Sequence, residues 1–271
     1  MTRACHERIS RLPGAGVALA ASVLACVSLA HGSELRQAVA YYRQTHERQI
    51  LAQLDHLVTM RSVAADPAGL AAAAGLLVDA LRQRGFEAHA LSESGAPPLV
   101  VGRWLVAGSA RTVVFYAHYD GQPVTASQWR SDPFGPVLRT GIGVDARVID
   151  WRTSALPLDP EGRLFGRAAA DDKASIIAFL TAFDALRAAG VRPAVNITVV
   201  WDGEEEAGSP HLEEELRQHA ALLRADLWLI GDVPIHQSGA PMLYFGARGV
   251  IGLDLTLYGA NRSLHDGHYG N

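Results

Sequence analysis

The chain has 271 residues and a mass of 29.0 kDa, with 49% hydrophobic and 19% charged residues and a mean hydropathy of +0.08. This composition is typical of a globular protein and excludes a disordered chain, because there are enough apolar residues to form a sizeable core. The formal net charge of -4 excludes a protein built to coat nucleic acid, which would carry a basic excess.

The first 32 residues have the pattern of an export signal. Three arginines precede an uncharged apolar run over residues 12–30, and small residues follow it. We therefore expect residues 1–32 to be a signal peptide, the product to be periplasmic or secreted, and the mature form to have no membrane span. A spanning helix is the alternative, which Pro13 weakens. Cys26 lies in a lipobox-like context and would be the site of a lipid anchor; with Cys5 it is one of only two cysteines, so the mature chain has no disulfide framework.

Beyond residue 32 the hydrophobic pattern predicts helices that alternate with strands. The predicted helices cover residues 33–63, 68–83 and 175–189, and the predicted strands cover residues 99–102, 112–117, 196–201 and 227–230. This order predicts an α/β domain with a mixed, largely parallel sheet flanked by helices. The turn-rich segment 138–162 is longer than most connections in compact domains, and it indicates either a rim of the site or a surface excursion.

Histidine and acidic residues follow directly on three of the predicted strands. They are His118 with Asp120, Glu204–Glu206, and Asp232. Because ligands bind at the carboxyl ends of strands in open α/β sheets, we expect these side chains to lie at one edge. Asp171 and Asp172, which precede a predicted helix, add two more carboxylates.

This number of carboxylates in one crevice requires a compensating positive charge, which two divalent metal ions would supply. Imidazole and carboxylate ligands without thiolates suit zinc, with manganese or cobalt as alternatives. A glutamate beside a ligand glutamate could act as general base on a water held between the ions. Each feature alone also has an ordinary interpretation, such as a surface histidine, a solvated helix start or a helix cap. Their joint occurrence favours a hydrolytic metal site.

Several segments together resemble the M20 family of metallopeptidases, in its dipeptidase and carnosinase-like branch. These segments are His118-Tyr119-Asp120-Gly121-Gln122-Pro123-Val124, Trp129 with Asp132-Pro133-Phe134, Gly166–Lys173, Glu204–Ser209 and Leu264–Gly270. The resemblance implies a zinc-exopeptidase type of fold, with a catalytic domain over residues 33–245. It also implies that residues 246–271 begin a smaller α+β lid and dimerisation domain, and that the full-length protein is a homodimer.

The resemblance further implies roles for individual residues. The implied metal ligands are His118, Asp171, Glu206 and Asp232. Asp171 would bridge the two ions, and Asp120 would orient the imidazole of His118. Glu205 is implied as the general base, and His265 as a lid residue that helps to hold the substrate.

The resemblance also implies a cis peptide bond between Asp171 and Asp172, and it has two departures. Ala168 and Ala174 stand where the family usually has glycine, so the backbone there must suit a Cβ atom. The last metal-binding histidine of the family has no counterpart within the 271 residues. We therefore expect the sequence to be the first part of a longer product, whose activity requires the C-terminal part.

The sequence thus predicts a dinuclear-metal hydrolase that cleaves amide bonds in dipeptides or other small peptides. One alternative is an N-acyl amino acid deacylase that uses the same site. Another is an inactive truncated form or a metal-free binding protein on the same fold. A dinucleotide-binding oxidoreductase is set aside, because no Gly-x-Gly-x-x-Gly sequence joins an early strand to a helix.

Overall fold

The computed structural model describes residues 32–92, 95–233, 235–240, 242–249, 251–265 and 267. Residues 1–31 of the predicted signal peptide, with both cysteines, lie outside the described residues. The chain divides into two compact units, Met1–Val233 and Pro234–Asn271. The domain boundary expected after residue 245 stays a prediction. No helix among the described residues is long and apolar enough to cross a membrane.

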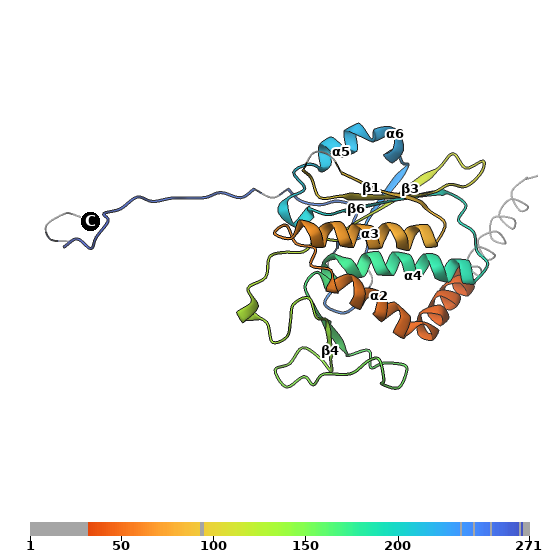
Figure 1. The fold of residues 1–271 in the computed structure, drawn as a ribbon, viewed down its shortest axis with the longest axis horizontal. Helices are drawn as coiled ribbons and strands as arrows, with labels where there is room; N and C mark the ends of the chain where they lie inside the picture. Colours follow the sequence, from red (N-terminus) through yellow and green to blue (C-terminus); the bar gives the residue numbers. More distant parts are fainter. Residues whose placement is uncertain are drawn as a thin grey trace, which may run out of the picture. The chain divides into compact units, whose positions relative to one another are not determined.

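A five-stranded sheet in the order β1-β2-β6-β3-β7 forms the centre of the first unit (Figure 1). Its strands are β1 (Glu87–Leu91), β2 (Leu99–Trp104), β3 (Thr112–His118), β6 (Asn196–Asp202) and β7 (Leu227–Ile230). β3 pairs in parallel with β6 and β7, whereas β2 is antiparallel to both β1 and β6. Four of the five strands therefore run in one direction, which confirms the predicted mixed, largely parallel sheet.

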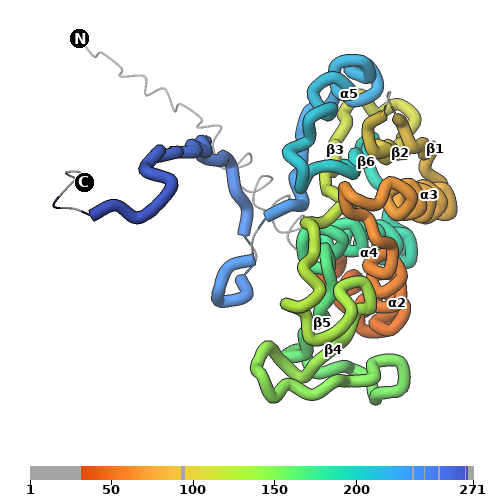
Figure 2. The backbone as a smooth tube through the Cα atoms, turned by 60° about the vertical axis from the view of Figure 1, so that its left-hand side comes forward, coloured from red at the N-terminus to blue at the C-terminus, as the bar shows by residue number. Residues whose placement is uncertain are grey.

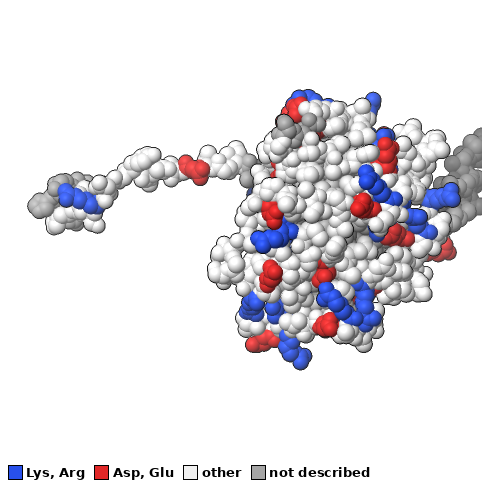
Figure 3. All heavy atoms as spheres, in the orientation of Figure 1, with Lys and Arg blue, Asp and Glu red and all other residues white. Residues whose placement is uncertain are grey.

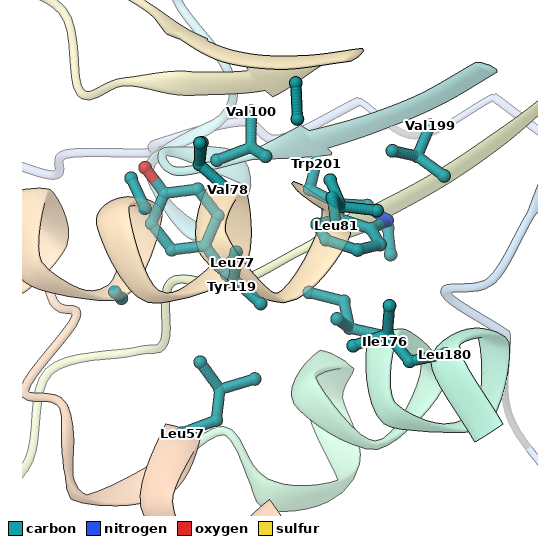
Figure 4. Packing of buried hydrophobic residues seen from close by; sticks show 14 of the residues in the cluster. Leu57, Leu77, Val78, Leu81, Val100, Tyr119, Ile176, Leu180, Val199 and Trp201 are labelled. Atoms are coloured by element: carbon teal, nitrogen blue, oxygen red, sulfur yellow. The ribbon is translucent and has the colours of Figure 1, made fainter. Parts of the chain in front are cut away.

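Helices cover both faces of this sheet (Figure 1). On one face lie α2 (Glu47–Thr59), α3 (Pro67–Gln83) and α4 (Ala174–Ala188), and on the other lie α5 (Leu212–Gln218) and α6 (Ala220–Leu223). Because side chains alternate along a strand, Val199 and Trp201 of β6 pack in the cluster beneath α3 and α4, whereas Val200 packs in the cluster beneath α5 and α6. Figure 4 shows the first cluster, where Leu77, Leu81 and Ile176 surround Trp201.

The remaining elements are short and lie in the connections. They are the antiparallel pair β4 (Val137–Arg139) and β5 (Arg163–Phe165), the 3-10 turns η1 (Ala126–Gln128) and η3 (Glu205–Ala207), and the turn η2 (Ala169–Lys173), whose backbone is not helical at Asp171 and Asp172. In both Figure 1 and Figure 2, β4 lies beside α2 and away from the five-stranded sheet. The turns η2 and η3 carry four of the acidic residues that the sequence singled out, Asp171, Asp172, Glu205 and Glu206.

The structure differs from the prediction at one helix and at one strand. The helix predicted over residues 33–63 is two helices, residues 32–45 and α2, and the second ends at Thr59. The side chains of Thr45 and His46 contact the carbonyl oxygens of Tyr41 and Tyr42, and such contacts compete with regular helix geometry. β1 was not predicted, because its sequence, Glu-Ala-His-Ala-Leu, is poor in strand-forming residues; its pairing with β2 makes it a strand.

The long segment 138–162 is held against α2. Arg152 forms an ion pair with Asp55 at 2.7 Å, and the backbone N–H of Leu158 donates to Glu47 Oε2 at 3.0 Å. Trp151 is buried. Basic and acidic side chains are interspersed on the face of the first unit that Figure 3 shows. These contacts anchor the part of the segment around residues 151–158 to α2, while most of its other side chains are exposed, as in a surface excursion.

Gly203, directly after β6, lies where the chain is packed too closely for a larger side chain. A Cβ atom there would lie 2.6 Å from Cζ of the fully buried Tyr119 and closer still to its hydroxyl, which donates to the carbonyl of Pro98. Because the ring has no free space to move into, we expect Gly203→Ala to lower the free energy of unfolding by about 1–3 kcal/mol in urea denaturation.

Gly75 provides the matched control for that substitution. It lies within α3, and a Cβ atom there would have no atom within 4 Å. Gly75→Ala should therefore raise the free energy of unfolding by about 0.5–1 kcal/mol, since alanine is the better helix former. If both substitutions lowered, or both raised, the free energy of unfolding, the packing argument would be contradicted.

Candidate metal centre

The centre of the site is His118, the last residue of β3, whose side chain is fully buried. Its ring lies among four carboxylates. Nδ1 is 3.1 Å from Asp120 Oδ1, and Nε2 is 2.9 Å from Asp171 Oδ1, 3.8 Å from Glu205 Oε2 and 4.0 Å from Asp232 Oδ2. The parallel register of β3 with β6 and β7 brings these residues to one edge of the sheet, as predicted from the sequence.

Asp120 links the histidine to the acidic turn η3. The carboxylate is buried, and Oδ1 accepts the backbone N–H of Glu205 at 3.2 Å, while Oδ2 accepts that of Glu206 at 3.1 Å. The same carboxylate lies against Nδ1 of His118, so Nε2 is the nitrogen that faces the other acids. One side chain thus orients both the imidazole and the backbone of the turn.

The turn η2 brings Asp171 to the site. The peptide bond between Asp171 and Asp172 is cis, which confirms that expectation. The side chain of Asp171 is 68% exposed, whereas Asp172 is buried and accepts the backbone N–H of His118 at 3.3 Å. Ala168 adopts a φ of 60° in the left-handed region, where a Cβ costs about 1–2 kcal/mol. Ala174 has ordinary helical torsions, so only one of the two glycine replacements strains the backbone.

Crowded carboxylates shift the pKa values of the site. Burial alone would lower the pKa of His118, but the hydrogen bonds and charges of Asp120 and Asp171 raise it to about 10. Burial raises the pKa of Glu205, and the nearby Asp232 charge adds to that shift. Burial also raises the pKa of Asp172 to about 6. The raised pKa of His118 reflects carboxylates that crowd one imidazole, and a divalent cation would compensate their negative charge.

The donor set fits a metal ion. One ligand atom each from His118, Glu205 and Asp232 lie within 4.8 Å of one another. Imidazole nitrogen with carboxylate oxygen is the donor chemistry of zinc in hydrolytic sites. The exposed carboxylate of Asp171 lies beside the same imidazole nitrogen and can join the set.

Two further predicted residues have contacts of their own outside this group. Glu206 Oε2 accepts the side-chain N–H of Gln122 at 2.7 Å, so Glu205 and not Glu206 faces His118 in the structure. His265 belongs to the second unit, where its Nδ1 accepts the backbone N–H of Gly267 at 3.1 Å. The roles predicted for both residues stay predictions.

Sequence reasoning assigned no role to Gln122 or Lys173, although both stand within the recognised motifs. Gln122 contacts the predicted ligand Glu206. Lys173 is fully buried and donates from Nζ to two backbone carbonyls at the end of α2. Their positions within these motifs, and the fact that Lys173 is the only lysine of the 271-residue sequence, are the signals that could have indicated them.

Comparison with known proteins gives the following relationships. Residues 114–244 match the model of Peptidase family M20/M25/M40. The Cys-Gly metallodipeptidase dug1 of Schizosaccharomyces pombe is 33% identical over 177 residues, which are 64% of this chain and 33% of that protein. The succinyl-diaminopimelate desuccinylase of Acidovorax ebreus is 29% identical over 219 residues, which are 76% of this chain and 49% of that protein.

The crystal structure of human carnosine dipeptidase 1 shares the fold, with a TM-score of 0.59 and 24% sequence identity over 73% of this chain and 41% of that one. The comparison confirms the predicted fold class. The chain spans between about a third and a half of the length of the curated relatives that it matches.

Proposed function

We propose that this protein is a metal-dependent hydrolase that cleaves the amide bond of dipeptides or other small peptides, because residues 114–244 match the model of the peptidase M20 family. The observation that carries the proposal is the convergence of His118, Asp171, Glu205 and Asp232 at the carboxyl ends of the parallel strands. The similarity to a protein named as a Cys-Gly metallodipeptidase favours a dipeptide as the substrate.

Two divalent ions, with zinc as the first choice, would be held by this edge of the sheet. His118 would bind through Nε2, because Nδ1 faces Asp120. Asp171 would bridge the ions, with Asp232 on the side of His118 and Glu206 on the other. When bound, such ions polarise the substrate carbonyl and lower the pKa of water.

The proton transfers are assigned to Glu205. Its carboxylate is partly exposed and lies 3.8 Å from His118 Nε2, so water and substrate can reach it. The carboxylate would accept a proton from the attacking water as the water oxygen bonds to the amide carbonyl carbon. It would then pass that proton to the nitrogen of the leaving amine, which departs as the amide C–N bond breaks. Burial raises the pKa of Glu205, and this brings the group nearer to the value that such proton transfers require.

A deacylase is the second candidate function. The similarity to a protein named as a succinyl-diaminopimelate desuccinylase favours it, because that reaction also breaks an amide bond. The residues at the candidate metal centre would bind the metal ions and transfer protons in the same way in both reactions. The substrate distinguishes the two functions.

A substrate panel tests the proposal. The native protein from its source, supplied with zinc, manganese or cobalt, should release amino acids from Cys-Gly or β-Ala-His, and a chelator should abolish the release. Faster hydrolysis of N-succinyl or N-acetyl amino acids would support the deacylase instead. A protein that holds metal but hydrolyses neither class would contradict both, and would support a binding protein.

We also propose that the protein is exported and that it is a homodimer. The pattern of residues 1–32 supports export, and the resemblance to the M20 dipeptidases supports the dimer. N-terminal sequencing of the native protein tests the first proposal, and light scattering in solution tests the second. An N-terminus at Met1 or a monomeric mass would contradict the respective proposal.

A further inference from the structure

The short turn that leaves α2, residues 57–63, contacts both segments that carry the candidate metal ligands. It includes the last residues of α2 and reverses through backbone hydrogen bonds, from Met60 N to Leu57 O at 3.3 Å and from Ser62 N to Met60 O at 2.8 Å. The turn precedes residues 114–244, which match the family model. We call residues 57–63 the α2 exit turn.

The first contact reaches the turn η2. Lys173, two residues after Asp171, directs its fully buried Nζ to Leu57 O at 2.9 Å and to Met60 O at 3.0 Å. Carbonyl oxygens at a helix C-terminus have no partner within the helix, and an amine satisfies them well. The end of α2 therefore holds the backbone on which Asp171 stands.

The second contact reaches the end of β3. The hydroxyl of Ser62, also buried, donates to the carbonyl of Tyr119 at 2.6 Å. The next residue, Val63, forms an isolated parallel bridge with Gly121. Tyr119 lies between His118 and Asp120, so these bonds hold the backbone that carries the imidazole and its orienting carboxylate.

The position of Asp171 depends on its backbone. Its side chain is 68% exposed and therefore has little packing of its own, yet its Oδ1 lies 2.9 Å from His118 Nε2. Between the two segments the backbone N–H of His118 also donates to Asp172 Oδ2, at the longer distance of 3.3 Å. A third element that contacts both segments would add to these direct contacts in fixing the spacing between His118 and Asp171.

We propose that the α2 exit turn is this third element, and that Ser62 and Lys173 are positioning residues that set the spacing of the metal ligands. The inference rests on the proposed function, because the spacing matters for a bound metal. Neither residue is one of the proposed ligands or the proposed base. Each acts through the backbone of a neighbouring ligand.

Zinc affinity of the full chain tests the proposal. Ser62→Ala and Lys173→Met should each raise the zinc dissociation constant about 10-fold or more, the range found when groups that orient metal ligands are removed. The visible absorption of bound cobalt should also change, since it reports ligand geometry. Ser62→Thr keeps the hydroxyl and should restore zinc affinity and the cobalt spectrum toward those of the wild type.

Arg84→Met is the matched control. The guanidinium of Arg84 is largely buried and links α2 to α4. Its Nη2 donates to Gln53 Oε1 of α2 at 3.2 Å and forms an ion pair with Asp184 Oδ2 of α4 at 2.6 Å. Asp184 lies eleven residues beyond Lys173, roughly 16 Å along the helix at 1.5 Å per residue. Arg84→Met should lower the melting temperature but leave zinc affinity and the cobalt spectrum unchanged.

Two failures can be told apart. If Ser62→Ala and Lys173→Met lower the melting temperature as Arg84→Met does, yet bind zinc and cobalt like the wild type, the α2 exit turn is only structural and the inference is wrong. If the wild-type chain itself binds no zinc, the proposed metal site is wrong, and the positioning role is overturned with it.

Discussion

Replacing Glu205 with glutamine should lower kcat by about 10²–10⁴-fold and leave the metal content nearly unchanged. Glutamine has nearly the same shape but cannot accept the proton of the attacking water. The backbone N–H of residue 205 would still donate to Asp120, which lies 3.2 Å away, so the turn η3 should keep its position. Activity assays of the wild-type and Glu205→Gln proteins, together with metal analysis of the same samples, provide the measurement.

Glu206→Gln is the comparison that separates the base from the ligand. If Glu206 binds the second metal, its amide variant should lose about one ion per chain, whereas the Glu205 variant keeps both. The structure makes this comparison necessary, because Glu205 lies nearer to His118 and Glu206 contacts Gln122. Loss of metal from Glu205→Gln but not from Glu206→Gln would reverse the two roles, and appreciable residual hydrolysis by Glu205→Gln would refute the base assignment.

Replacing Asp171 with alanine should empty both metal positions. A bridging carboxylate contributes to both ions and also keeps them apart, so neither position is complete without it. Metal analysis should show a fall from about two ions per chain to none, as expected from a bridge between two metals, and hydrolysis should be lost with the metal. Because the Asp171 side chain is 68% exposed, its removal leaves no cavity and the fold should be maintained.

Asp145→Ala is the control for this substitution. Asp145 is an exposed aspartate in the segment 138–162, outside the candidate metal centre, and its removal changes the net charge of the chain by the same amount. Its metal content should equal that of the wild type. Retention of two ions by Asp171→Ala would contradict the bridging role.

The sequence predicted the main strands of the sheet and the edge where the candidate site lies. Strands β3, β6 and β7 are short runs of mainly β-branched, aromatic and other apolar residues, and each ends at or just before the polar residues of interest. Because parallel strands end at the same edge, local pattern together with this rule placed His118, Asp120, Glu205 and Asp232 near one another. The structure brings them together as expected.

Local pattern failed where long-range pairing or side-chain competition decides the structure. β1 has few strand-forming residues and exists because it pairs with β2. The interruption near His46 depends on side-chain contacts with backbone carbonyls, which compete with helix geometry and leave no mark in the hydrophobic pattern.

By itself, the sequence determined the class of fold and the chemistry at the strand ends, because both are encoded in residues that are neighbours along the chain. Only the tertiary structure decided that Glu205 faces His118, since the backbone N–H groups of Glu205 and Glu206 both donate to Asp120, which is distant in the sequence. It likewise revealed the contact of Ser62 with Tyr119, which lies 57 positions further along the chain. The contacts of Lys173 with Leu57 and Met60 span more than 110 positions. Such contacts form when separate elements pack against one another, and a local sequence pattern carries no information about which distant residues will meet.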